Sequence, residues 1–325
     1  MDRYYMREII TKYGLLVVLV LLVMFFSNRT EVFLTLPNFI NILRQVSIMG
    51  IVSVGMAFVL ISGGIDLSVG SIIGVSSVLA ATLMVNGVNI PTAFLATLIA
   101  GVLIGLFNGL MINNVKIPPL ITTLGSMTIF RGAAYIITGG LPVYGFSAVS
   151  FSFLGQGYIN IIPVPVLVMA AVFLSGFIVL YTTRFGRYVH AIGGNETASE
   201  LSGIPVKKIK YFVYAISGFL ASLAGLVLLS RINSGQPNAG QGYELDIVTA
   251  VVLGGVSIYG GEGRLSGVLS GILIMGILTN GMILMNVNEY YQLVVKGAVL
   301  LAAVGTDVYI SNMEIKDESV VKGQN

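Results

Sequence analysis

The sequence carries very little charge for its length. Of its 325 residues only 10% are Asp, Glu, Lys or Arg, whereas 56% are hydrophobic and the mean hydropathy is +0.94. A soluble domain usually carries about a quarter charged residues, so this deficit excludes an ordinary water-soluble fold. The composition predicts an integral membrane protein.

Cysteine is absent, and histidine occurs once, as His190. The absence of cysteine excludes disulfides, thiol catalysis and cysteine metal sites. A single histidine has no second histidine with which to hold a metal ion, so we expect His190 to be an ordinary loop residue.

Signatures of enzyme chemistry are missing as well. The chain has no phosphate-binding loop G-x-x-x-x-G-K-S/T, no metal-ligand spacing of His, Asp and Glu, and no serine with a plausible base nearby. We predict no enzyme activity, metal or cofactor on this chain. Any energy-driven function must then draw on a partner or on an ion gradient.

Long uncharged runs cover most of the chain, at residues 14–28, 45–65, 67–115, 132–183, 211–230 and 265–288. A spanning helix needs roughly 20 mostly apolar residues, so the longest runs hold two spans each, divided by turn signals at 86–91 and 155–165. The runs do not alternate as barrel strands do. With 120–138, 245–259 and 290–309, they predict an all-α bundle of about ten membrane helices, some short or broken.

The positions of Lys and Arg predict the orientation of this bundle. With a cytoplasmic amino terminus, the outer segments hold Arg29, Arg44 and Arg231, and the inner segments hold Arg3, Arg7, Lys12, Lys116, Arg184, Arg187, Lys207, Lys208, Lys210, Arg264, Lys316 and Lys322. This excess satisfies the positive-inside rule. We predict one domain over 1–325, with cytoplasmic ends at 1–12 and 311–325 and a helical bundle over 13–310. The net charge of +3 then reflects topology and indicates no nucleic-acid binding.

Two regions combine paired glycines with polar or small residues, at 61–68 (ISGGIDLS) and at 253–261 (LGGVSIYGG). Broken helices in transporters expose backbone groups to a cavity at such places, and the two regions hint at a duplicated half. They give the candidate pathway or gating residues Gly63, Gly64, Asp66, Ser68, Gly254 and Gly255.

Asp66 places a carboxylate inside an otherwise uncharged stretch, where an ionised group is expensive in hydrocarbon. Such a group usually faces protein, water or a solute pathway. We favour a structural role, in which Asp66 caps a helix over 69–85, over direct contact with a solute.

Five motifs resemble those of a known family: GGIDLSVGS at 63–71, KIPPLITTLG at 116–125, GQPNAGQGYELD at 235–246, VLGG at 252–255 and YYQLVVKG at 290–297. In this order they resemble the membrane permease of ribose-type ABC sugar importers, from about 38 to 307. The resemblance implies import of ribose or a similar monosaccharide across the bacterial inner membrane. It also implies a cytoplasmic ATP-binding subunit carrying ATP and Mg, an extracytoplasmic sugar-binding protein, and a second permease copy.

The segment 184–210 is the largest predicted cytoplasmic loop. Asn195 is placed to cap a short helix over 196–202, which Gly203 would end. From these residues alone the segment is a solvated basic loop. The resemblance instead implies an ATPase-coupling helix, although Thr197 stands where alanine is expected and the glycine lies one residue late; the matching positions are Glu196, Thr197, Ala198, Ser199, Glu200, Leu201 and Gly203.

Several alternatives remain open. The chain could be a branched-chain amino-acid ABC permease, an ion-coupled secondary transporter or facilitator that uses Asp66, or a membrane scaffold. The aromatic residues of 139–160 form either an interfacial belt or, with 233–246, a docking face for the binding protein. We expect Arg131 and Lys296 to extend toward the lipid headgroups, and the glycines spaced by four at 101, 105 and 109 to allow tight helix packing.

Overall fold

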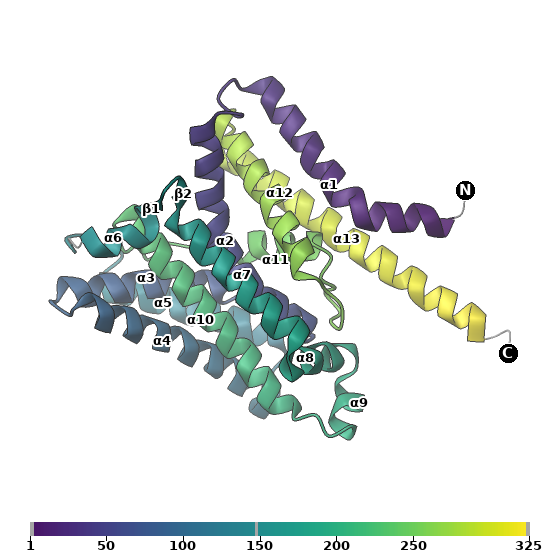
Figure 1. Cartoon of the computed structure of the whole chain (residues 1–325). Coiled ribbons are helices and arrows are strands. Elements are labelled where there is room, and N and C mark those ends of the chain that lie inside the picture. The colour runs from purple at the N-terminus through teal and green to yellow at the C-terminus, as the bar shows by residue number, and fades with distance from the viewer. Residues whose placement is uncertain (1–2, 147–148, 323–325) are drawn as a thin grey trace.

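The computed structural model describes residues 3–146 and 149–322, and within them the chain is almost entirely helical (Figure 1). The remaining residues belong to the predicted terminal segments and to the predicted outer segment 139–160. The elements are α1 (Arg3–Arg29), α2 (Leu36–Ile61), α3 (Val69–Val85), α4 (Ile90–Leu110), the π-helical turn η1 (Met111–Val115), α5 (Pro119–Thr138), α6 (Val149–Gln156), β1 (Tyr158–Ile159), β2 (Ile162–Pro163), α7 (Val164–Thr182), α8 (Arg184–Gly194), α9 (Glu196–Leu201), α10 (Val206–Ile232), α11 (Tyr243–Leu253), α12 (Leu265–Leu284) and α13 (Glu289–Lys322).

Seven helical segments in the described part of the chain are long and apolar enough to cross a membrane: Leu36–Ile61, Ile90–Val115, Pro119–Thr138, Val164–Thr182, Val206–Ile232, Leu265–Leu284 and Glu289–Val308. Two shorter apolar helices, Gly14–Arg29 and Val69–Val85, add to them. The predicted all-α membrane fold is confirmed. The two-residue strands β1 and β2, an antiparallel pair, are a small addition that the sequence did not indicate.

One predicted span is only a half-helix. Where we expected a span over 245–259, α11 has 11 residues. At a rise of about 1.5 Å per residue it is roughly 16 Å long, against a hydrocarbon core of about 30 Å. The helix ends because Gly255 adopts φ +83°, a left-handed conformation that favours glycine. The expectation of short or broken helices is confirmed here.

The core is built around α2 and α10. Within their most apolar windows 83% and 72% of residues are buried, against 6% for α13. The seam between α4 and α10 depends on glycine, because a Cβ on Gly105 would lie 2.1 Å from the Tyr214 carbonyl oxygen, and one on Gly218 would lie 2.1 Å from that of Gly101. The predicted tight packing of the glycine faces is confirmed.

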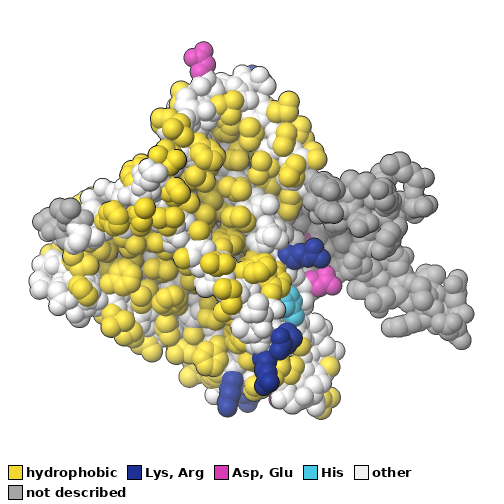
Figure 2. Space-filling view, in the orientation of Figure 1, with side chains coloured by type: hydrophobic (Ala, Val, Ile, Leu, Met, Phe, Trp, Pro, Cys, Tyr) yellow, Lys and Arg dark blue, Asp and Glu magenta, His cyan; other side chains and the backbone are white. Residues whose placement is uncertain are grey.

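The elements divide between two ends of the bundle. Helices α8 and α9 lie at the lower right of Figure 1, where α7 ends and α10 begins, and α6 with the short hairpin lies at the opposite end of these helices. Figure 2 shows a largely hydrophobic face on the body of the bundle, with Lys and Arg gathered toward the end that carries α8 and α9.

Candidate functional site

The segment between α7 and α10 is a pair of capped helices. The side chain of Thr183 accepts a hydrogen bond from the Gly186 backbone N–H at the start of α8, at 3.3 Å. Asn195 does the same for α9, accepting from the Ala198 N–H at 2.9 Å. Each cap satisfies a backbone donor that has no partner within its helix. The predicted Asn195 cap is confirmed.

The carboxyl end of α9 is equally well defined. Gly203 has φ +82° and its N–H donates to the Glu200 carbonyl at 3.0 Å, while the Ile204 N–H donates to the Ser199 carbonyl at 3.1 Å. These two bonds form a Schellman motif, which ends a helix at a left-handed glycine. The predicted helix and its glycine stop are therefore confirmed, and α9 is a short rigid unit.

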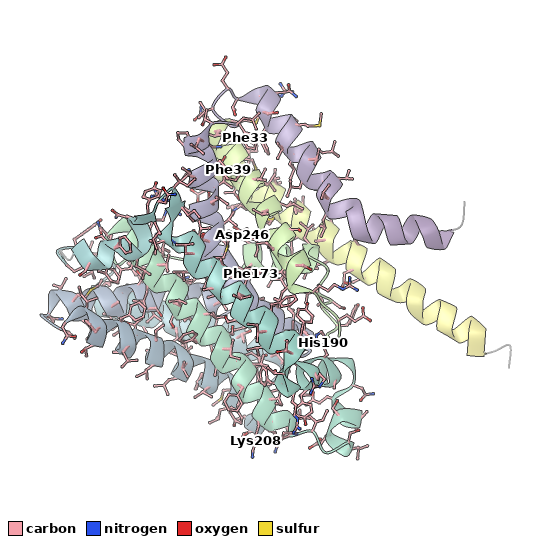
Figure 3. The ribbon with its side chains drawn as sticks, viewed as in Figure 1. Phe33, Phe39, Phe173, His190, Lys208 and Asp246 are labelled. Atoms are coloured by element: carbon pink, nitrogen blue, oxygen red, sulfur yellow. The ribbon has the colours of Figure 1, made fainter. Side chains whose placement is uncertain are left out.

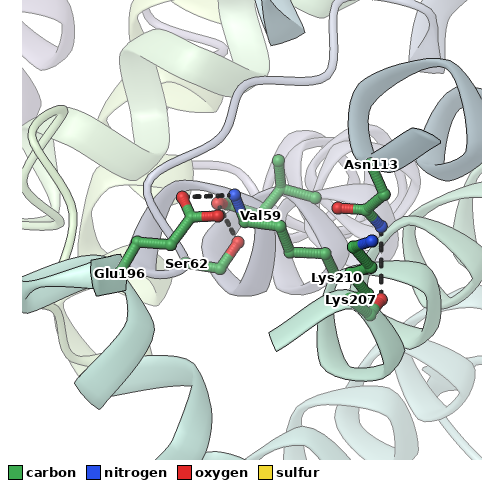
Figure 4. Close-up of polar contacts among 6 residues, drawn as sticks. All are labelled: Val59, Ser62, Asn113, Glu196, Lys207 and Lys210. Carbon is green, nitrogen blue, oxygen red and sulfur yellow. Dashed lines mark hydrogen bonds and ion pairs between the residues drawn. The ribbon is translucent and has the colours of Figure 1, made fainter. Parts of the chain in front are cut away.

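Side-chain contacts hold α9 and the start of α10 in place, whereas other side chains of α9 project into solvent. Glu196 forms an ion pair with Lys210 of α10 at 2.6 Å, and the Asn113 amide donates to the Lys207 carbonyl at 3.2 Å, joining η1 to α10 (Figure 4). Leu201, by contrast, is 85% exposed. Among the predicted coupling residues Ser199 is buried and the others face solvent: Glu196, Thr197, Ala198, Glu200, Leu201 and Gly203.

Asp66 is completely buried, at 0% exposure, between α2 and α3. One carboxylate oxygen accepts from the Ser68 backbone N–H at 3.0 Å and from the Ser68 hydroxyl at 2.5 Å. The other accepts from the Ser217 hydroxyl of α10 at 2.7 Å. Ser68 is the residue that precedes α3, so Asp66 lies at the start of this helix as predicted, but it bonds the turn before the helix rather than capping an N–H within it. Both oxygens accept hydrogen bonds, and the side chain has no exposed surface at which a solute could contact it in this conformation.

The bonds of Asp66 continue into a network across four elements. The Asn108 amide of α4 donates to the Ser68 hydroxyl at 2.9 Å, and the Ser126 hydroxyl of α5 donates to the Asn108 side-chain oxygen. All these groups are buried. Polar groups at such depth are costly unless they are satisfied, so this network fixes the α2–α3 turn against α4, α5 and α10.

The two glycine pairs occupy equivalent turns. After α2, the Gly63 N–H donates to the Leu60 carbonyl at 2.9 Å and the Gly64 N–H to that of Val59 at 2.9 Å. After α11 the same pattern recurs, with Gly255 donating to Val252 at 2.8 Å and Val256 to Val251 at 3.2 Å. Gly63 and Gly255 have nearly equal φ values of +78° and +83°. Both helices therefore end in a Schellman motif, as α3, α9 and α12 also do, so the shared pattern does not by itself establish a duplicated half.

We predicted that two basic residues, Arg131 and Lys296, extend toward the lipid headgroups. In the structure both side chains instead bond to groups inside the protein. Lys296 of α13 pairs with Asp246 of α11 at 2.6 Å, and the side chains are 20% and 11% exposed. Arg131 of α5 donates to the Pro237 and Ala239 carbonyls at 2.9 and 2.7 Å. A buried cation is stabilised by an acceptor at close range, and both side chains find one inside the protein.

Asp246 is a functional candidate that the sequence did not single out. It lies in the first turn of α11, and Figure 3 labels it within the body of the bundle. The signal was present, because Lys296 in an apolar run requires a nearby anion. Two glycines of α3 make room for the neighbouring charges: a Cβ on Gly70 would lie 2.0 Å from a Glu244 carboxylate oxygen, and one on Gly74 would lie 2.6 Å from an Arg131 guanidinium nitrogen.

A bundle of apolar helices with two glycine-ended turns, buried polar groups and a capped helix pair at one end defines a multi-pass membrane permease. The model of a family described as "Branched-chain amino acid transport system / permease component" matches residues 38–304. The chain belongs to this family of transport-system permease components.

Curated relatives sharpen this assignment. The ribose import permease protein of Bacillus subtilis is 45% identical over 94% of this chain and 95% of its own length. That of Haemophilus influenzae is 43% identical over 92% and 94%. The D-allose transport system permease protein of Escherichia coli is 39% identical over 92% of each. No solved structure matches the chain. The predicted resemblance to ribose-type permeases is confirmed.

Proposed function

We propose that this chain is the membrane subunit of an ATP-driven ABC importer that moves ribose or a similar monosaccharide across the bacterial cytoplasmic membrane. The observation that carries the proposal is the similarity of more than nine-tenths of the chain to ribose import permeases. The family description names branched-chain amino acids, but the similar curated proteins carry sugar names. The sugar importer is therefore favoured over the amino-acid permease.

The end of the bundle that carries α8 and α9 is the cytoplasmic side in this proposal. Lys and Arg gather toward it, and the positive-inside rule places such an excess in the cytoplasm (Figure 2). The amino end of α1 and the carboxyl end of α13 lie on the right of Figure 1. Both termini are then cytoplasmic.

Helix α9 is the contact for the ATP-binding subunit, which supplies ATP and Mg. Its caps and the Glu196–Lys210 ion pair hold it in one orientation. Leu201 then presents an apolar side chain, 85% exposed, for a pocket on the partner. An aliphatic side chain held on a rigid element can serve as the anchor that fills a pocket on a partner. Since each copy offers one such helix and an ABC importer has two ATP-binding subunits, a second permease copy completes the transporter.

The opposite end is the docking face for the sugar-binding protein. The two predicted docking segments lie side by side, because the Val143 N–H donates to the Gly235 carbonyl at 2.8 Å and the Gly235 N–H donates back at 2.9 Å. Tyr144, Phe153 and Tyr158 are exposed there. Aromatic side chains suit both a protein interface and the membrane boundary.

The experiment that tests this function is reconstitution of the chain in liposomes, together with the ATPase encoded by an adjacent reading frame and a candidate binding protein. ATP-dependent uptake of labelled ribose is expected, and uptake that is equal without ATP would favour a facilitator. The facilitator alternative requires Asp66 to exchange protons with a solution, and this carboxylate is sealed by hydroxyl and amide donors.

A further inference from the structure

Four glycines bring the turn after α2 and the α11–α12 loop into backbone contact with the last turn of α8. The Gly261 N–H donates to the Ile61 carbonyl at 2.8 Å, which joins the α11–α12 loop to the end of α2. A Cβ on Gly193, in the last turn of α8, would lie 1.8 Å from that same carbonyl oxygen and 2.4 Å from the Gly261 nitrogen. We call this contact the glycine junction: Gly63, Gly193, Gly260 and Gly261.

The remaining contacts of the junction are also between backbones. A Cβ on Gly260 would lie 2.8 Å from the Gly63 Cα and 3.0 Å from the Gly193 carbonyl oxygen, and one on Gly261 would lie 2.9 Å from the Gly194 Cα. Side chains can absorb a small displacement by changing rotamer, but closely packed backbones cannot. Movement of the end of α8 must therefore move the turns on both sides of it.

His190 fastens the junction from within α8. Its Nδ1 lies 2.9 Å from the Gly261 carbonyl oxygen. Because a carbonyl can only accept, Nδ1 carries the proton in this bond. Figure 3 shows His190 at α8, beside the loop that joins α11 to α12. The expectation of an ordinary loop residue is wrong, since the side chain connects two elements that are 71 residues apart.

The two turns held by the junction lead directly into the bundle. One ends α2 and continues to Asp66 and α3, and the other ends α11 and continues to α12. On the other side of the junction, Asn195 connects α8 to α9 without an intervening loop. Within the loop 254–264 the Ser257 N–H donates to the Glu262 carbonyl at 3.1 Å, which holds the two sides of the loop together.

We propose that His190 and the glycine junction transmit the displacement of α9 simultaneously to the turns after α2 and α11, with His190 as the positioning residue that keeps the α11–α12 loop attached to α8. This proposal rests on the proposed function of α9 as the ATPase contact. It goes further by assigning the route from that contact to both glycine turns.

Adjacent glycines provide a matched test in the full complex of permease, ATPase and binding protein. A Cβ on Gly193 meets backbone atoms, whereas one on Gly194 meets nothing within 4 Å. Gly193→Ala is expected to lower ribose uptake per ATP hydrolysed by about tenfold, within the usual range of coupling between sites, and Gly194→Ala should stay near the parent value. Equal effects of the two variants would overturn the proposal.

His190 variants keep the proposal testable if Gly193→Ala fails to fold. His190→Ala should lower uptake per ATP several-fold, and His190→Asn should restore it because the Asn amide nitrogen occupies nearly the position of Nδ1. The chain lacks cysteine, so spin labels at Ser202→Cys and Glu262→Cys report the α9-to-loop distance without background from this subunit. The distribution of this distance should stay narrow through the ATP cycle in the parent and should broaden in His190→Ala. Unchanged uptake and an unchanged distribution would refute the proposal.

The experiments distinguish a failure of the proposed importer function from a failure of the junction proposal. If the parent complex shows no ATP-dependent uptake, the importer assignment falls. If the parent is coupled and Leu201→Ala releases the ATPase, yet Gly193→Ala and His190→Ala remain coupled, only the junction proposal falls.

Discussion

The turns after α2 and after α11 end in the same hydrogen-bond pattern but are anchored in different ways. The first continues into Asp66, whose buried network reaches α4, α5 and α10. The second continues into a partly exposed loop held by the glycine junction and by a bond from the Ile258 N–H to Asp307 of α13, at 3.2 Å. Both turns meet at the glycine junction; the first is held in addition by a buried polar network, and the second by a bond to helix α13.

The buried charges follow the same division. On the α2–α3 side the carboxylate of Asp66 accepts from hydroxyl and amide donors, and no ion pair to it occurs among the described residues. On the α11 side Asp246 pairs with Lys296 of the peripheral helix α13. Asp66 is thus held by a network that includes the core helix α10, whereas Asp246 is held by the peripheral helix α13.

The largest expected effect is at Asp66. Asp66→Ala leaves the Ser68 N–H and the Ser217 hydroxyl buried without an acceptor, which should cost about 4 kcal/mol of folding stability at 1–3 kcal/mol per unsatisfied group and more for groups bonded to a charge. Thermal unfolding in detergent would measure it. Asp66→Asn, which retains one acceptor, is the matched control and should lose less; equal stability of Asp66→Ala and the parent would show that the network does not anchor the turn.

Breaking the Asp246–Lys296 ion pair should cause the second largest loss of folding stability. Lys296→Met leaves the Asp246 carboxylate uncompensated and should cost about 3 kcal/mol, the usual result of breaking one side of a buried pair. The double variant Asp246→Leu with Lys296→Met should recover most of that stability. A double-mutant cycle on unfolding temperatures would reveal the coupling, and strictly additive losses would mean that the pair does not hold α13 to α11.

Replacement of the left-handed glycines that end α2 and α11 should lower folding stability by similar amounts. Gly63→Ala and Gly255→Ala each place a Cβ at φ near +80° with no heavy atom closer than 3.7 Å, so the cost is conformational, about 1 kcal/mol in each case. Parallel unfolding measurements would compare them. A much larger loss at one position would show that the two turns are not equivalent.

The smallest effect on stability should come from Leu201. Leu201→Ala removes a side chain that is 85% exposed and should change stability by less than about 0.5 kcal/mol. Co-purification of the ATPase should nevertheless fall sharply. Thr197 is also exposed on α9, so Thr197→Ala serves as the control. If Leu201→Ala still co-purified with the ATPase, Leu201 would not be the apolar anchor of the proposed contact.

Much of the inner-end site could be predicted from local signals. Asn195 and Gly203 determine the ends of α9 because capping depends on residues only a few positions apart, and the structure has both. The start of α3 near Asp66 followed from the same kind of signal. The inward position of Ser199 could not be read in this way, since it depends on which face of a short helix meets the bundle.

The sequence by itself determined the membrane class, the apolar helices, the helix ends at glycine and the family, because these depend on composition and on short-range patterns. Only the tertiary structure decided the partners of the buried polar groups. Asp66 meets Ser217, Lys296 meets Asp246, and His190 meets Gly261 across 151, 50 and 71 residues of chain. Pairing over such separations depends on how the helices pack, and for Asp66 and His190 glycines at Gly55 and Gly193 let the neighbouring backbones come within contact distance.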